Sequence, residues 1–536
     1  MITRILGLVL TSGRRRLLIA ISVAAVAWGL PPSEAAGATF TVNSTADQVD
    51  ATPGDGRCSI GRTRVITCTL RAAIMEANAL AGVSHTIVLP AGTYTLTIAG
   101  PNENGGANGD LDVKRSMTIM ASGGLARIRG NNGPVWDDRI FHVFAGATLT
   151  MSGVEIANGN PTGNGGAILI ESSGTLKLAS STVRDSASGL SGAGIFNAGT
   201  LTLVDSTVRD NISSSMAGGI HNGGVMTLVR SQVIGNTAGS GGGGIFNGGG
   251  VRASVVMVDS TIEGNRAAAG DSGGGIMNNG QLTIDRSTIS QNGAGEDGGG
   301  IFQFGVSAFL TLTNSTLSGN VAGAGFFGGG ISNIDGTATL NNVTITSNTA
   351  AQGGGISHFA APVGPFPVTG IFSVRNSIVG GNGASVSPDC LGSINSQGFN
   401  LVQNTQGCVL DGASPGNITG LAPRLGVLQN NGGPTKTHGL CTGVGIPEAS
   451  CAAASPAIGT ASPDVDPGIP GTVVLGACAN SDQRGVGRPQ GTRCDIGAFE
   501  VAPVGAFLVT PGEAAVEAGE ALFLEFTWTH THRWRT

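Results

Sequence analysis

The sequence predicts an all-β protein that folds as a right-handed parallel β-helix with disulfide-stapled ends. Three observations predict this fold: a glycine-rich phrase that recurs through the middle of the chain, alternating apolar and polar residues within each repeat, and cysteines found only outside the repeats. Gly makes up 91 of the 536 residues without the triplet period of collagen, and 40% hydrophobic residues exceed the content of a disordered chain. The net charge of −6 gives no basic surface for nucleic acid.

Residues 1–38 are predicted to form a cleaved export signal. Arg14–Arg16 precede an apolar run at 17–30, and the small residues Ala36 and Ala38 follow it, in the order typical of a signal peptide. The run is too short to span a bilayer comfortably, and no later stretch reaches about 18 apolar residues. We therefore expect an exported protein, secreted or at the cell surface, with no transmembrane span in the mature chain.

A phrase of the form G-G-[GA]-I marks the repeat and recurs every 25 to 31 residues. Its Ile stands at Ile168, Ile195, Ile220, Ile245, Ile276, Ile301, Ile331 and Ile356. Between these lie apolar residues that alternate with Thr, as in Leu201-Thr202-Leu203, which indicates half-buried strands. The Gly runs exclude helices from the repeat. Short strands at a fixed period stack as the coils of a solenoid, and the rival leucine-rich solenoid would need far more Leu.

Two series of Asn recur at fixed places in the repeat and are expected to be structural. Stacked in register, each side-chain amide can donate to a carbonyl of the next coil and tolerate the left-handed backbone of a tight turn. The first series, the Asn ladder, comprises Asn211, Asn236, Asn265, Asn292, Asn320 and Asn348. The second comprises Asn197, Asn222, Asn247, Asn278 and Asn333, with Gln303 and His358 as variants.

The eight cysteines fall as near neighbours outside the central repeats. They are Cys58 and Cys68, Cys390 and Cys408, Cys441 and Cys451, and Cys478 and Cys494. None forms a C-x-x-C pair, so zinc ligation by cysteine is not expected. Their spacing favours four local disulfides in an oxidising compartment without fixing the connectivity.

Several of these motifs resemble known families of exported bacterial proteins. G-G-[GA]-I with apolar-x-x-Asn resembles the polymorphic outer-membrane protein repeats of the pectin-lyase-like β-helix. Residues 39–79 resemble a CSLREA-type domain whose signature, Cys68–Ile74, has Thr69 for Ser and Ala72 for Glu, and G-D-L-D-V at 109–113 is typical of that family's first coils. D-Q-R-G…C-D-I-G-A-F-E at 482–500 resembles a choice-of-anchor domain. The resemblance implies a surface-exposed or secreted β-helix of mostly unassigned role.

These features divide the chain into five parts. They are a signal peptide at 1–38, a CSLREA-like cap with first coils at 39–145, the repeat β-helix at 146–385, C-terminal coils with a choice-of-anchor-like closing segment at 386–501, and a tail at 502–536. The tail lacks an apolar helix followed by basic residues and is interpreted as the opening of a truncated further domain. Near the last cysteines, a charged group is expected to form ion pairs that close the open end of the rod. It comprises Asp482, Arg484, Arg488, Asp495 and Glu500.

No motif predicts a catalytic residue. G-D-S-G-G at 270–274 matches the surroundings of a serine-protease nucleophile, but Ser272 stands at a variable turn of the repeat, and a protease is not expected. His221 and His358 have no His or Cys at ligand spacing and are assigned to core or turn positions. No dinucleotide- or phosphate-binding fingerprint can be distinguished from the glycine-rich background of the repeats.

No cofactor or bound metal is expected, although two acidic groups are weak candidates for a Ca²⁺ site. Asp271, Glu296 and Asp297 lie on neighbouring turns, and Asp110 and Asp112 lie in G-D-L-D-V, although solvated or capped turns explain both groups. Arginines one coil apart form a further candidate, interpreted as a surface ion-pair row. They are Arg184, Arg209 and Arg230, with Asp185 and Asp210 beside the first two.

We therefore expect a non-enzymatic, adhesin-like surface or secreted β-helix that presents turns and loops to glycans or cell-surface proteins. The alternative is a carbohydrate-active enzyme of the pectin-lyase-like class, a polysaccharide lyase or hydrolase. An acidic cleft beside Arg on adjacent coils would favour the enzyme. A face of Thr, Ser and Asn without such a cleft would favour the non-enzymatic protein.

Overall fold

The computed structural model describes residues 37–61, 66–80, 84–100, 103–131, 136–360, 370–412, 415–445, 448–465, 477–502, 507–510 and 525–528. Nearly all of the predicted signal peptide and most of the predicted tail lie outside these residues. Within the described part of the tail, β42 (Phe507–Thr510) and β43 (Glu525–Trp528) pair as antiparallel strands.

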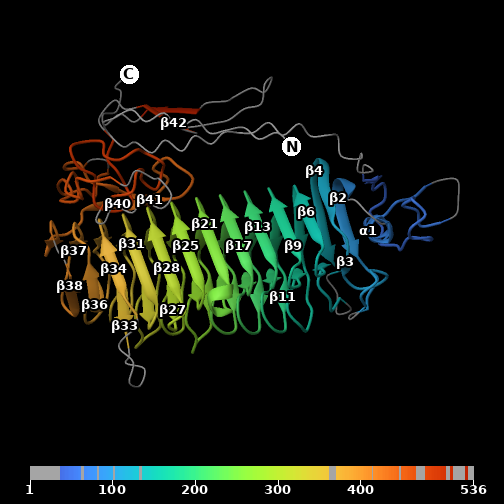
Figure 1. Ribbon diagram of the computed structural model, residues 1–536, viewed down its shortest axis with the longest axis horizontal. Helices are drawn as coiled ribbons and strands as arrows, with labels where there is room; N and C mark the ends of the chain where they lie inside the picture. The colour runs from blue at the N-terminus through green and yellow to red at the C-terminus, as the bar shows by residue number, and fades with distance from the viewer. Residues whose placement is uncertain are drawn as a thin grey trace, which may run out of the picture. The chain divides into compact units, whose positions relative to one another are not determined.

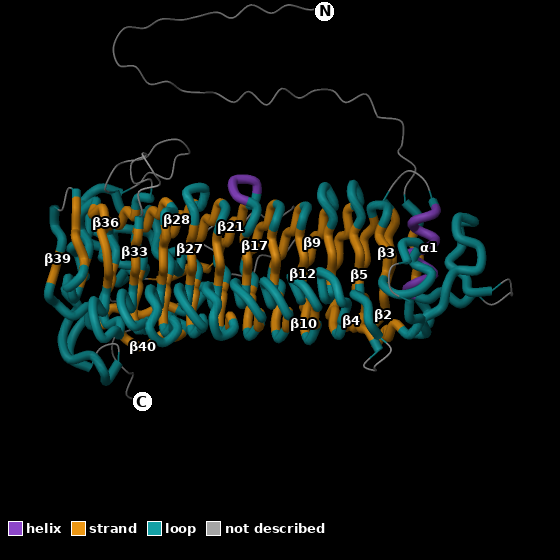
Figure 2. The backbone as a smooth tube through the Cα atoms, turned by 90° about the horizontal axis from the view of Figure 1, so that it is seen from below, coloured by secondary structure: helices purple, strands orange, loops and turns teal. Residues whose placement is uncertain are grey.

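The chain from Thr39 to Thr419 forms a parallel β-solenoid in which each coil adds one strand to each of three rows (Figures 1 and 2). The long-strand row contains β6 (Thr148–Ser152), β9 (Thr175–Ala179), β13 (Thr200–Val204), β17 (Val225–Val229), β21 (Ser254–Val258), β25 (Gln281–Asp285), β28 (Phe309–Thr313), β31 (Thr337–Asn341) and β34 (Phe372–Arg375). The short-strand row contains β7 (Val154–Ala157), β10 (Thr182–Arg184), β14 (Thr207–Arg209), β18 (Gln232–Ile234), β22 (Thr261–Glu263), β26 (Thr288–Ser290), β29 (Thr316–Ser318), β32 (Thr344–Thr346), β35 (Ile378–Val379), β37 (Leu401–Val402) and β39 (Ile418–Thr419). The predicted all-β parallel solenoid is confirmed.

The third row, the Ile row, begins after the glycine-rich phrase. It contains β3 (Leu111–Val113), β5 (Phe141–Val143), β8 (Ile168–Ile170), β12 (Ile195–Asn197), β16 (Ile220–Asn222), β20 (Ile245–Asn247), β24 (Ile276–Asn278), β27 (Ile301–Phe304), β30 (Ile331–Ile334) and β33 (Ile356–Phe359). A smaller sheet contains β11 (Ala187–Ser188), β15 (Ile212–Ser213), β19 (Thr237–Ala238) and β23 (Arg266–Ala267), and a 3-10 turn, η1, spans Gly250–Arg252. At the ends of the stack, β1 (Thr39–Thr41), β2 (His85–Leu96) and β4 (Met117–Gly130) precede the regular coils, and β36 (Cys390–Ser396) and β38 (Cys408–Asp411) follow them.

The interior of the solenoid is filled by the apolar residues of the alternating pattern. The repeat Ile side chains of the Ile row are buried, as are inward residues of the long-strand row such as Leu201 and Leu203. They stack in register from coil to coil, so Leu201 pairs with Leu176 on one side and Met226 on the other. One continuous core therefore runs along the stack.

Buried side chains also link the coils by hydrogen bonds. Asn236 Nδ2 donates to Asn265 Oδ1 of the next coil at 3.0 Å and to the main-chain carbonyl of Val208 in the preceding coil at 3.0 Å. The same amide-to-amide bond recurs from Asn211 through Asn348 to Asn382. The second series bonds likewise, from Asn197 to the His358 ring.

The left-handed turn residues are not the ladder residues themselves, contrary to expectation. Positive φ falls on the residue before each ladder Asn, as at Asp210 (55°), Gly235 (65°) and Gln291 (57°). The ladder Asn is thereby turned into the core, where its amide is buried.

A row of serines, which was not predicted, adds a third set of links between coils. Ser206 N donates to Ser231 Oγ at 3.1 Å, and the bond repeats along Ser181, Ser206, Ser231, Ser260, Ser287 and Ser315. Val343 occupies the place of the next serine and interrupts the row. The row resumes in the following coil, where Ser377 Oγ accepts from Val343 N.

The helix α1 (Leu70–Ala79) covers the first coils and was not predicted. Thr69 caps its N-terminus by accepting from Ala72 N at 3.1 Å. Arg71 is buried, pairs with Asp47 at 2.6 Å, and donates to the carbonyls of Gly106, Gly109 and Asp110. Thr69 and Arg71 thus cap the helix and anchor the loop that leads into β3.

The C-terminal segment 423–501, which includes the antiparallel pair β40 (Leu425–Gln429) and β41 (Thr437–Leu440), lies against the side of the solenoid. Thr316 Oγ1 donates to Gln483 Oε1 at 2.6 Å, and Ala498 N donates to Thr344 Oγ1 at 3.0 Å. The segment therefore buries the outer face of β26, β29 and β32 in the short-strand row.

The predicted charged group of this segment forms buried ion pairs. Arg484 pairs with Asp482 at 2.7 Å and lies over the Phe499 ring, and Arg488 pairs with Glu500 at 2.9 Å. Asp495 accepts from Gly459 N and Val501 N. The expectation that this group closes the open end was wrong, because the segment packs sideways on the coils.

Four disulfides join the cysteines as near neighbours: Cys58–Cys68, Cys390–Cys408, Cys441–Cys451 and Cys478–Cys494. The first lies in the N-terminal cap and the second joins β36 to β38 in the last coils. The other two lie within the C-terminal segment. Among the described residues, no helix is long and apolar enough to cross a membrane.

Replacing Ala217 by Gly should stabilise the protein. The position three residues before the repeat Ile has positive φ in all eight coils that carry the G-G-[GA]-I phrase, and seven of these have Gly there, whereas Ala217 has φ 59°. A Cβ at the equivalent Gly192 would lie 2.6 Å from Ile195 O. We expect the free energy of unfolding to rise by about 1 kcal/mol in urea denaturation. The control is Ala193→Gly, which should lower the free energy of unfolding because Ala193 does not have positive φ. Equal changes in the free energy of unfolding for the two variants would contradict strain at Ala217.

Acidification should loosen the C-terminal segment through His438. Its Nδ1 donates to Gly426 O at 2.7 Å and its Nε2 accepts from Ser318 at 2.9 Å, and burial lowers its pKa below 6.5, opposed by the Gly426 bond and Glu448. The unfolded segment therefore takes up a proton first, and docking weakens as pH falls through about 6.5. The protection of the 425–440 amides, measured relative to the intrinsic exchange rate at each pH, should fall between about pH 7.5 and about pH 5. The same loss of protection in His438→Gln would contradict this.

Candidate functional site

The outer face of the long-strand row is a flat array of polar side chains. One line of outward residues runs in register through Thr202, Thr227, Val256, Thr283, Thr311 and Thr339. A second line beside it runs through Thr200, Val225, Ser254, Gln281, Phe309 and Thr337. Successive members of each line are about 4.8 Å apart, the spacing of neighbouring strands. We call these two lines the Thr face.

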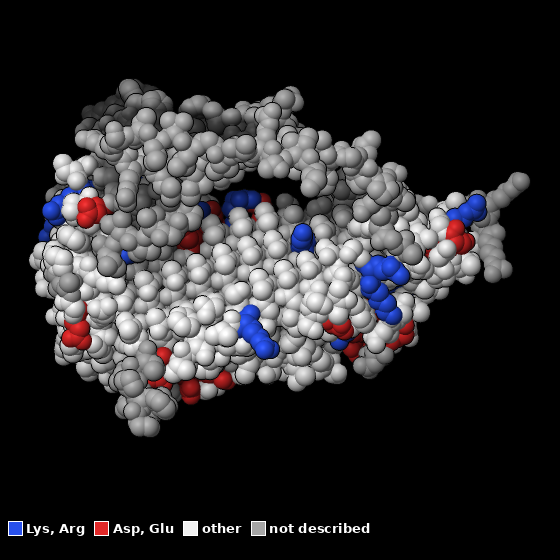
Figure 3. Space-filling view, viewed as in Figure 1, with Lys and Arg blue, Asp and Glu red and all other residues white. Residues whose placement is uncertain are grey.

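The Thr face carries no charged residue between Thr200 and Thr339. Lys177 stands one coil before Thr202, in register with it, and Asp285 stands at the end of β25. The space-filling view shows the same face of the molecule with few charged side chains over these strands (Figure 3). Several members of the array are exposed, including Val225, Val256 and Phe309.

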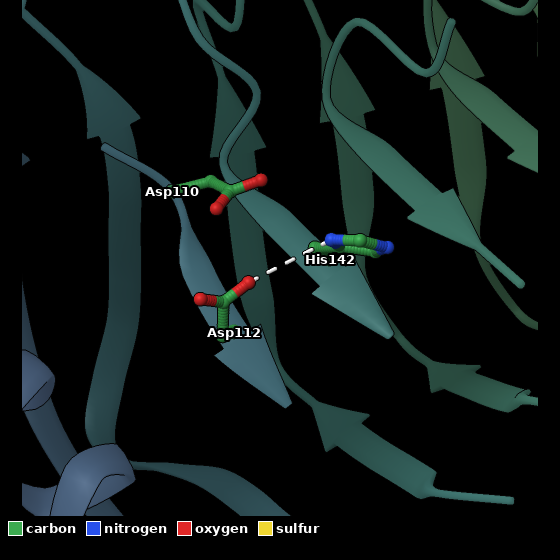
Figure 4. A group of neighbouring side chains, drawn as sticks. All are labelled: Asp110, Asp112 and His142. Atoms are coloured by element: carbon green, nitrogen blue, oxygen red, sulfur yellow. Dashed lines mark ion pairs between the residues drawn. The ribbon is translucent and has the colours of Figure 1, made fainter. Parts of the chain in front are cut away.

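A second candidate site lies on the first coils, where Asp110, Asp112 and His142 meet (Figure 4). Asp112 and His142 occupy the same outward position of β3 and β5 and pair in register. Asp110 comes from the turn before β3, which Arg71 anchors. One ligand atom from each of the three lies within 4.8 Å of the other two, and this is the one such group among the described residues.

Two atoms at this cluster face each other without a hydrogen-bond partner. They are Asp112 Oδ1 and His142 Nδ1, 3.6 Å apart, in side chains that are 0% and 9% exposed. The other oxygen of Asp112 accepts from Gly106 N at 2.8 Å. His142 Nε2 bonds to Glu171 Oε1 at 3.1 Å.

Burial dominates the electrostatics of the cluster. Desolvation, added to the negative charge of Asp138, raises the pKa of Asp110 to about 8. Desolvation also raises the pKa of Asp112 to about 7 against the Gly106 hydrogen bond. Burial and the positive charge of Arg139 lower the pKa of His142 to about 4.

The acidic residues predicted as a weak Ca²⁺ site are placed on adjacent turns. Glu296 N donates to the carbonyl of Asp271 at 2.8 Å, and Asp297 Oδ1 accepts from Phe327 N at 2.8 Å. The three carboxylates do not form a group of mutually close ligand atoms in the described structure. The Ca²⁺ hypothesis at these residues stays a prediction.

The arginines divide between two rows. Arg184 and Arg209 pair in register, and each contacts an acidic neighbour: Glu155 and Asp185 for the first, Asp210 for the second. Arg230 was wrongly placed in this row, because Ile234 is the residue in register with Arg209. Arg230 instead pairs with Asp205 of the preceding coil at 2.7 Å.

The remaining candidates have ordinary structural surroundings. Ser272 Oγ accepts from Asp297 N at 3.3 Å. The His221 ring lies between Phe196 and Phe246, with centroids 4.5 and 5.0 Å away. His358 ends the second series by bonding to Asn333.

His142 was missed by sequence reasoning, although a signal existed. Leu111 and Phe141 occupy the place of the repeat Ile in the first coils, so extending the repeat upstream would have aligned Asp112 with His142.

Comparison with known proteins adds little on function. No protein-family model and no curated protein matches the chain. Among solved structures, a pectate lyase, Pel9A, matches with 14% sequence identity and a TM-score of 0.38, covering 87% of this chain and 97% of that chain. So low a TM-score says nothing about activity or substrate.

Proposed function

We propose that this chain is an exported, non-enzymatic solenoid that binds an extended glycan along the Thr face, in the manner of an adhesin. The observation that carries the proposal is the uncharged array on β13, β17, β21, β25, β28 and β31. Each Thr offers a hydroxyl that donates and accepts, beside a methyl group. Their repetition at about 4.8 Å suits a polymer whose own hydroxyls also repeat.

The surroundings of the array also favour binding to sugars. Phe309 and Val256 are exposed within it and offer apolar contact for the C–H faces of sugar rings. Export is supported by the four disulfides and by the resemblance to CSLREA-type and choice-of-anchor proteins.

The electrostatics of the arginines weigh against the alternative, a polysaccharide lyase. An arginine that removes a proton must first lose its own, which needs a lowered pKa. The Glu155 hydrogen bond raises the pKa of Arg184, and the Asp205 hydrogen bond raises the pKa of Arg230. These groups therefore stay protonated and act as ion-pair partners.

Introducing two negative charges on the Thr face should weaken glycan binding. We expect the purified mature chain to bind at least one of polygalacturonate, alginate and a neutral glucan, with or without Ca²⁺, without forming unsaturated products that absorb ultraviolet light. In Thr283→Glu/Thr311→Glu, the affinity for the glycan should fall about tenfold or more. The two carboxylates repel acidic polymers, and they hold bound water that any polymer would have to displace.

The matched control is Thr237→Glu on β19, which lies in the smaller sheet and should bind as the unmodified protein does. An equal loss in the control, or no binding to any of the polymers, would contradict the proposed face. Unsaturated products would instead establish the lyase.

A further inference from the structure

We propose that Asp110, Asp112 and His142 bind one divalent transition-metal ion of the Zn²⁺ class, which fastens the loop before β3 to the first coils. This site is separate from the Thr face and does not depend on the glycan proposal. It lies on the Ile row, whereas the Thr face belongs to the long-strand row.

The distance between the two unpartnered atoms fits one bound ion. Asp112 Oδ1 and His142 Nδ1 are buried and 3.6 Å apart, which is too long for a hydrogen bond. Ligands about 2.0–2.2 Å from a tetrahedral ion lie roughly 3.3–3.6 Å from each other. One ion between the two atoms therefore satisfies both.

The imidazole of His142 is oriented as a metal ligand would be. His142 Nε2 bonds to Glu171 Oε1 at 3.1 Å, and Glu171 Oε2 is held by Ala145 N at 3.0 Å. An Nε2–H that donates to a carboxylate leaves the lone pair on Nδ1, aimed at Asp112. Metal-binding histidines use this arrangement, in which a carboxylate orients the ring and raises its basicity. The Phe144 ring packs against the imidazole, with the two ring centroids 4.0 Å apart.

The cluster also carries unbalanced negative charge. Asp110, Asp112 and Asp138 are buried, and among the described arginines and lysines only Arg139 pairs with one of their carboxylates, its Nη1 donating to Asp110 Oδ2 at 2.9 Å. Both carboxylate oxygens of Asp138 already accept hydrogen bonds, from Arg139 N and Asp110 N, so Asp138 is not one of the proposed metal ligands. A divalent cation between Asp110 and Asp112 offsets the remaining negative charge.

The donor atoms determine the class of ion. Ca²⁺ and Mg²⁺ take oxygen ligands, six or more in number, whereas this group has three protein ligands and one is an imidazole nitrogen. Two carboxylates with one imidazole suit Zn²⁺ and similar first-row ions.

To test this, metal is first removed from the full mature chain with a chelator. The stripped protein is then titrated with Zn²⁺ alone, and binding is followed by calorimetry and elemental analysis. We expect one tightly bound Zn²⁺ per chain and a rise in the thermal midpoint. His142→Gln and Asp112→Asn should each remove the tight site. Glu171→Gln, which only orients the ring, should weaken binding by roughly 10- to 100-fold.

His221→Gln is the matched control. His221 is another outward histidine of the Ile row, but its described interactions include no carboxylate. It should bind Zn²⁺ normally, as should the Thr-face variant. Circular dichroism of each variant separates loss of the site from loss of the fold. The inference is overturned if folded, unmodified protein binds no stoichiometric Zn²⁺, if Ca²⁺ competes equally, or if folded Asp112→Asn and His142→Gln retain the site.

Discussion

The hydrogen-bonded stack of buried amides is the constraint on which the rest of the structure depends. Each ladder Asn bonds to the amide of the next coil and to the backbone of the preceding one, so a coil that slipped in register would bury unsatisfied polar groups. Because the interior residues fix the register, the intervals between repeats can vary from 25 to 31 residues, and the extra residues lie in turns such as η1. Glycine at the left-handed positions before the Ile row allows the close approach of successive turns.

A fixed interior leaves the outer faces free to differ. On the short-strand row, the downstream coils β26, β29 and β32 present Thr288, Thr316 and Thr344, which the C-terminal segment buries through side-chain hydrogen bonds. The upstream coils of the same row present Arg184 and Arg209 with their acidic partners. The long-strand row keeps its uncharged Thr face outward. Different coils of the one solenoid therefore supply a docking surface for the chain's own segment, an ion-pair row and the proposed binding face.

The sequence allowed prediction of much of what recurs from coil to coil, although the serine row was missed. The strands, the core and the stacked Asn positions follow from a repeated local pattern, since the same place in each repeat meets the same neighbours. Arg230 was misplaced because it was aligned by spacing, although the strand register puts Ile234 beside Arg209. The left-handed residues were assigned one position too late, because turn propensity alone does not distinguish Asn211 from Asp210. Contacts between distant segments, such as Gln483 with Thr316, leave no local pattern at all.

For the same reason, only two of the three residues of the candidate metal group were predicted from the sequence. Asp110 and Asp112 are two residues apart in the sequence, whereas His142 joins them only through the register of β3 and β5. The claim that stacked amides make the coils one cooperative unit is tested most directly by hydrogen exchange on Asn265→Ala beside the exposed control Gln232→Ala. The account predicts lost protection in the flanking coils as well as the altered one, with the free energy of unfolding lowered by about 2–3 kcal/mol. Loss confined to the coil of Asn265, with stability otherwise equal to the control, would contradict it.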